Sequence, residues 1–171
     1  MPTALQMASD DIALKAAVAR SRKLLNKRAM VAAAASAVPI PGLDWAVDAA
    51  MLSRLIPEIN KEFGLTPQQL DKLDPKKRDQ VQKAVTMVGS VLIGKLISRD
   101  LVIKAATKIG MRLTTKQLAK YVPFAGQIVS AAVGYAAIRY LGEEHMKDCI
   151  RVAREAQLEV PLLEYSGRTR L

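Results

Sequence analysis

The stretch that decides the fold is residues 121–149, which read YVPFAGQIVSAAVGYAAIRYLGEEHMKDC. Between Lys120 and Arg139 it holds 18 residues without a charge. As one helix this uncharged part would extend about 27 Å, which is close to the thickness of a bilayer core. Its length therefore permits insertion into a membrane.

Small side chains recur at every fourth position of this stretch, at Gly126, Ser130 and Gly134. Positions four apart lie on one side of a helix, where small residues let a second helix approach closely. This glycine-zipper pattern predicts a helix-packing face, either for another helix of the same bundle or for contacts within a membrane.

The composition favours helices along the whole chain. Of 171 residues 50% are hydrophobic and only 4% aromatic, so Ala, Leu, Ile, Val and Met have to fill the core. These residues favour closely packed helices over sheets. We expect an all-α fold, a compact multi-helix bundle with two long Ala/Gly-rich hairpin helices. The expected domain covers residues 1–159, with a short tail at 160–171.

A long first helix is expected to start at Ser9 as its N-cap, with Asp10 and Asp11 in the first turn. Basic residues gather in the middle of this helix, at Arg20, Arg22, Lys23, Lys27 and Arg28. They form either a basic side for a membrane surface or a solvated side of a core helix.

Capping signals divide the middle of the chain. A second long helix is expected over residues 43–63, ended by Gly64. Thr66 and Asp74, each followed by proline, open two further helices, the second reaching about Ser98. Its first turn holds Lys76, Lys77 and Arg78, an unfavourable place for positive charge, which indicates that they bind something outside the helix.

The net charge of +10 favours partners with negative charge. Anionic lipid and acidic proteins fit this charge, whereas nucleic acid is disfavoured because few aromatic residues are present for base stacking. A second set of basic residues stands at four-residue spacing, interrupted by Gly110: Lys104, Lys108, Arg112, Lys116 and Lys120. This set is either a stripe for lipid headgroups or a solvated outer face.

The pattern V-P-x-x-G occurs at residues 38–42 and again at 122–126, 84 positions later. An Ala-rich segment follows each copy. The turn residues of the pattern are Pro39, Pro41, Gly42 and Pro123. Two helical hairpins related by an approximate twofold axis would explain the repetition.

Sites for chemistry are incomplete in this sequence. Residues 89–96 nearly spell a phosphate-binding loop, but Leu96 replaces the Ser or Thr that binds magnesium, and the apolar spacing suits a continuous helix. His145 and Cys149 lie four apart with Asp148 beside them, so they form either part of a metal site or, on the simpler interpretation, a half-exposed histidine at the end of a packed helix. We expect no catalysis, no metal and no cofactor.

Residues 38–65, VPIPGLDWAVDAAMLSRLIPEINKEFGL, resemble the helical region that follows the nucleotide-binding domain of immunity-related, interferon-inducible GTPases. They also resemble a group of bacterial GTPase-associated membrane proteins of unknown function. The matching positions of this stretch are Pro39, Pro41, Gly42, Asp48 and 63–65. Residues 122–149 are similar to the second glycine-rich helix of the bacterial group, at Pro123, Gly126, Gly134, Leu141 and Gly142.

The resemblance implies a helical domain that associates with membranes or transmits the state of a GTPase. The nucleotide-binding half of such proteins has no counterpart here, so GTP hydrolysis is not implied.

The sequence thus predicts a non-enzymatic helical module that associates with an anionic membrane, with a GTPase or with another protein partner, and that is able to form a homo-oligomer. The alternative is a soluble helical adaptor, or an immunity- or chaperone-like protein, that binds an acidic protein partner. A single cysteine and an N-terminus without a secretion signal favour the cytoplasm, at or in the inner face of a membrane.

Overall fold

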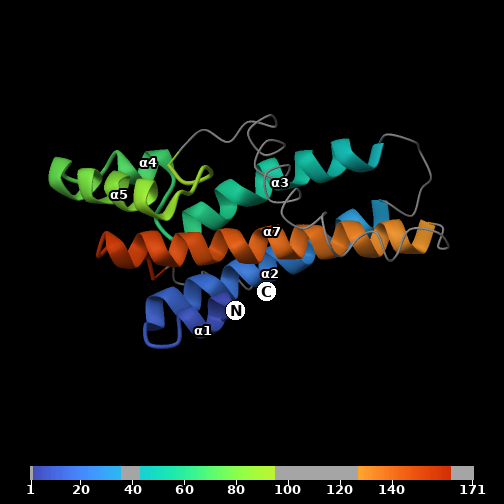
Figure 1. The fold of residues 1–171 in the computed structure, drawn as a ribbon, viewed down its shortest axis with the longest axis horizontal. Coiled ribbons are helices and arrows are strands. Elements are labelled where there is room, and N and C mark those ends of the chain that lie inside the picture. The colour runs from blue at the N-terminus through green and yellow to red at the C-terminus, as the bar shows by residue number, and fades with distance from the viewer. Residues whose placement is uncertain (1, 36–42, 95–126, 163–171) are drawn as a thin grey trace, which may run out of the picture.

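The computed structural model describes residues 2–35, 43–94 and 127–162, with helices and no strand in these ranges (Figure 1). The helices are α1 (Ala4–Met7), α2 (Ile12–Ala35), α3 (Leu43–Glu62), α4 (Pro67–Leu70), α5 (Pro75–Val88) and α7 (Gln127–Glu155). The expected all-α fold is confirmed. Side chains at 32–35, 43–51, 127–134 and 137 are outside the description.

α2 and α7 lie side by side and run in opposite directions. Leu25 packs against Gly142, where an added methyl group would lie 2.6 Å from Leu25 Cδ1. Near the start of α2, Asp10 pairs with Arg154 in the last turn of α7. Residue numbers therefore rise along one helix as they fall along the other, and the last turns of α2 lie beside the first turns of α7.

α3 also runs antiparallel to α2, which makes α3 and α7 parallel. Arg20 Nε contacts Glu62 Oε2 at 2.5 Å, and two turns further along α2 Arg28 Nη2 contacts Glu58 Oε1 at 2.9 Å. The end of α2 and the starts of α3 and α7 consequently lie at one end of the molecule, on the right in Figure 1. The opposite end holds α4, α5 and the last turns of α7.

The core lies where α2, α3, α5 and α7 meet. In α3 the buried positions follow a helical repeat, as expected for a helix with one face against the core. The largest buried side chains are Leu25, Leu55, Ile56, Ile59, Phe63, Leu65, Ile93, Ile138, Met146 and Ile150. Burying each stabilises the fold by about 1.5–3 kcal/mol relative to leaving it exposed.

Local capping chemistry explains where most of these helices begin and end. Gly64 follows α3 in the left-handed conformation, at φ +74°. Thr66 forms a capping box with Gln69 at the start of α4, and Asp74 Oδ1 accepts from the Lys77 amide at the start of α5. The structure confirms the roles that the sequence predicts for these three residues.

Two expected boundaries are wrong. The helix that begins at Pro75 ends at Val88 rather than near Ser98, because Gly89 adopts a left-handed C-cap at φ +72°. α2 begins after Asp11, whose Oδ1 accepts from the Leu14 amide, so Ser9 is not its cap. The short helix α1, which precedes α2, is not predicted from the sequence.

Several predicted features fall on residues outside the description. These are the two V-P-x-x-G turns with Pro39, Pro41, Gly42 and Pro123, the basic set at 104–120, and with them the twofold repeat. They stay predictions. Within the described ranges, no helix has the combination of length and apolar character that crossing a bilayer requires.

Candidate functional site

A buried polar cluster, made of Asn60, His145 and Cys149, joins α3 to α7. Asn60 Nδ2 donates to the carbonyl oxygen of Leu92 at 2.9 Å. This bond leaves Asn60 Oδ1 as an acceptor, so His145 Nε2 donates to it at 2.8 Å. Cys149 Sγ lies 3.7 Å from Asn60 Oδ1 and 3.7 Å from His145 Nε2. The cluster therefore links two helices and the loop after α5.

Burial decides the chemistry of the polar cluster. His145 is 3% exposed, and burial lowers its pKa to about 4, so the ring is neutral at pH 7. Burial also raises the pKa of the Cys149 thiol well above its usual value, and the charge of Asp148 adds to this effect. A protonated, buried thiol is neither a nucleophile nor a metal ligand. The expected half-exposed histidine is wrong, because His145 lies inside the bundle.

Asp148 does not complete a ligand set with these two residues. Its carboxylate accepts from Arg151 Nη1 at 3.1 Å. Partial burial raises the pKa of Asp148, while the charge of Arg151 opposes the rise. No group of three or more His, Cys, Asp or Glu side chains suited to a metal ion occurs within the described ranges. The geometry of His145 and Cys149 is that of a structural cross-link.

The segment that resembles a phosphate-binding loop is described as far as Gly94. The continuous helix expected there is wrong, since Gly89 and Gly94 both have positive φ and the segment after α5 is a turn. A helix precedes the segment, where a phosphate-binding loop follows a strand. Its Leu92 carbonyl accepts from Asn60, and Ile93 is buried in the core, so this loop closes over the polar cluster.

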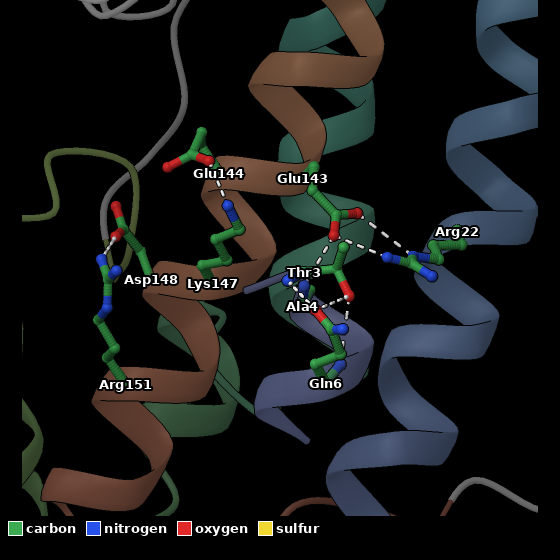
Figure 2. A network of polar contacts seen from close by, with 9 residues as sticks. All are labelled: Thr3, Ala4, Gln6, Arg22, Glu143, Glu144, Lys147, Asp148 and Arg151. Atoms are coloured by element: carbon green, nitrogen blue, oxygen red, sulfur yellow. Dashed lines mark hydrogen bonds and ion pairs between the residues drawn. The ribbon is translucent and has the colours of Figure 1, made fainter. Parts of the chain in front are cut away.

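Glu143 ties three helices together on the other side of α7 (Figure 2). Its Oε1 accepts from the Ala4 amide at 2.7 Å and from Arg22 Nη2 at 2.7 Å, and its Oε2 accepts from Arg22 Nε at 3.2 Å. Burial by itself would raise the pKa of Glu143, but the hydrogen bonds from Arg22 and Ala4 outweigh it and hold the pKa below its usual value. The contact orients α1 on the bundle. Sequence reasoning missed it because the partners lie more than 100 residues apart.

The basic residues of α2 divide into two kinds. Arg20, Arg22 and Arg28 are partly buried, and each pairs with a glutamate of α3 or α7. These arginines are neither a free membrane surface nor a solvated charge run, because they hold α2 against its neighbours. Lys27, in contrast, is exposed.

The prediction that the first turn of α5 serves a group outside its own helix is explained by Lys77. Its Nζ donates to the carbonyl oxygens of Ala156 and Gln157, both at 3.2 Å. These carbonyls follow the last turn of α7, where the helix dipole favours a cation.

An apolar end of the bundle is formed by residues 29–35 of α2 and 127–138 of α7. Neither segment contains a charged residue. Met30 is 68% exposed and Val31 is 52% exposed on this end of α2. Large apolar side chains this exposed, on adjacent uncharged helix ends, are typical of a contact surface.

The structure describes only part of the predicted helix-packing face. Ser130 and Gly134 lie in α7, in the apolar end, but their surroundings are outside the description, and Gly126 lies outside it altogether. The predicted basic surface of Lys104, Lys108, Arg112, Lys116 and Lys120 also lies outside. The close approach that is described occurs two turns further on, between Gly142 and Leu25.

Comparison with protein-family models, with curated proteins and with solved structures gave no match. The resemblance to the helical region of immunity-related GTPases therefore stays a prediction from the sequence.

Proposed function

We propose that this protein is a non-enzymatic helical module that associates with anionic membranes through its apolar end. The observation that supports this function best is the meeting of two uncharged helix ends, residues 29–35 of α2 and 127–138 of α7, with Met30 and Val31 exposed on α2. An exposed apolar surface next to a basic body fits the interface between lipid chains and headgroups.

The magnitudes suit reversible binding. Moving Met30 and Val31 from water into an apolar phase contributes about 2–4 kcal/mol together. Each basic residue near an anionic surface adds about 1 kcal/mol, and the chain has a net charge of +10. The apolar contribution is smaller than that of one acyl chain, so attachment needs the basic residues as well and is reversible.

A protein partner is the second candidate, either a GTPase, as the sequence resemblance implies, or an acidic protein bound by a helical adaptor. One observation favours it. α3 begins at the same end of the bundle and carries Asp44 and Asp48 in its first two turns, and carboxylates oppose contact with anionic lipid. A polar protein surface would accept them more readily.

Flotation with vesicles separates the two functions. We expect the protein to float with vesicles that contain phosphatidylserine and to stay at the bottom of the gradient with pure phosphatidylcholine. Met30→Ser combined with Val31→Ser should reduce flotation. The matched control is Met87→Ser, a substitution at a side chain that is 74% exposed on α5, and it should leave flotation unchanged. Absence of flotation with either lipid would refute membrane association and leave the protein-partner function.

A further inference from the structure

Three exposed cations, one from each long helix, lie at the border of the apolar end. They are Lys27 of α2, Arg54 of α3 and Arg139 of α7. Lys27 and Arg54 make no ion pair with any residue in the described ranges, and the same holds for Arg139. Arg20, Arg22 and Arg28 of α2 differ from these cations, because each of them forms an ion pair with a glutamate.

Contacts between the helices place the three cations at one level along the bundle. Asn60 of α3 contacts His145 of α7, and these two helices are parallel. Arg54 lies six residues before Asn60, and Arg139 lies six residues before His145. Arg54 and Arg139 are therefore at the same level. Leu25 contacts Gly142, so Lys27 and Arg139 lie two and three residues from that contact, both toward the apolar end. At a rise of about 1.5 Å per residue, all three lie within about one helical turn of each other.

Tyrosines adjoin this level on α7. Arg139 lies over the ring of Tyr135 at 5.8 Å from the centroid, and its Nη1 donates to the Tyr135 hydroxyl at 3.2 Å. Tyr140 is 42% exposed next to it. Tyrosine and arginine together are enriched at the depth of lipid headgroups, where one part of the side chain is apolar and the other is solvated.

We infer that Lys27, Arg54 and Arg139 form a cationic belt that binds the phosphates of anionic lipid headgroups beside the apolar end. This inference rests on the proposed membrane association. Nucleic acid is the poorer partner for the belt, because the three cations come from three different helices and border the uncharged segments 29–35 and 127–138, whereas a nucleic acid backbone needs a row of cations along one face.

Two triple variants with equal net charge test the belt. The first is Lys27→Gln, Arg54→Gln and Arg139→Gln. The control changes three other exposed cations, Lys15→Gln, Lys72→Gln and Lys76→Gln, which lie away from the apolar end. Both variants fall from +10 to +7, so a general effect of charge is the same in each.

Binding to phosphatidylserine vesicles is measured by sedimentation for the wild type and both variants. We expect the belt variant to lose about 100-fold in affinity, the equivalent of three lost headgroup contacts, and the control to lose less than about 5-fold. Equal losses would overturn the belt while membrane association stands. A wild type that does not bind these vesicles would overturn membrane association itself. Circular dichroism checks that both variants keep the helical content of the wild type.

Discussion

Lowering the pH from 7 to 5 should destabilise this protein through His145. The unfolded side chain titrates near pH 6.5, whereas burial lowers the pKa of the folded one to about 4. Between these two values the unfolded chain binds a proton that the folded chain does not, so the free energy of unfolding falls as the pH falls. The full difference is about 3 kcal/mol, of which about 2 kcal/mol is lost between pH 7 and pH 5.

His145 is the only histidine, which makes the experiment unusually direct. Urea unfolding followed by circular dichroism at pH 7, 6 and 5 measures the loss in the wild type. His145→Gln retains a donor for Asn60 but has no group that titrates in this window, so its stability should be nearly constant from pH 7 to pH 5. Carboxylates contribute equally in both proteins and cancel in the comparison.

Two results would refute this reasoning. One is a pKa near 6.5 for the single imidazole of the folded protein, measured by NMR. The other is an equal loss of stability in the wild type and in His145→Gln. Either one would mean that the ring is reached by water and that the polar cluster is not closed.

Three further substitutions test the packing, each by urea unfolding at pH 7. Gly142→Ala places a methyl group 2.6 Å from Leu25 Cδ1. The overpacking cost of about 1–3 kcal/mol should exceed the gain of about 1 kcal/mol in helix propensity, so we expect the variant to be less stable than the wild type. A more stable variant would contradict the close approach of α2 and α7. Glu143→Gln weakens the contacts with Arg22 and should cost about 1 kcal/mol, with the pH dependence below pH 5 reduced as well. Asp74→Ala removes the cap of α5 and should cost about 1 kcal/mol, whereas Asp79→Ala, at an exposed position on the same helix, should cost about half as much or less.

Local chemistry made part of this fold readable from the sequence. Gly64, Thr66 and Asp74 act through hydrogen bonds and backbone angles of their own neighbourhood, so their roles need no knowledge of the rest of the chain. The same logic could have found α1, because Thr3 and Gln6 repeat the capping box of Thr66 and Gln69.

The remaining features depend on distant partners. The apolar residues around Gly89 predict a helix interior, yet the chain turns there and brings Leu92 to Asn60. Asn60 and His145 stand 85 residues apart, and neither carries a local sign of the other. The ion pairs of the α2 arginines could not be predicted for the same reason. The sequence does not distinguish a basic residue that pairs with a distant glutamate from one that has no partner.

The cationic belt illustrates what the fold adds to the charges. Lys27, Arg54 and Arg139 belong to three separate segments, each with its own pattern, and the sequence gives no reason to group them. Only the antiparallel contact of α2 with α7, and the parallel contact of α3 with α7, bring them to one level.

Fluorescence of Trp45, the only tryptophan, tests the membrane account most directly because it lies in the first turn of α3, at the end of the bundle that should enter lipid. Vesicles of phosphatidylserine with bromine on the acyl chains should shift its emission to shorter wavelength and quench it. A tryptophan placed at Met87 in a Trp45→Phe background should respond to neither. Emission from Trp45 that stays unchanged while the protein is bound to the vesicles would contradict entry by this end.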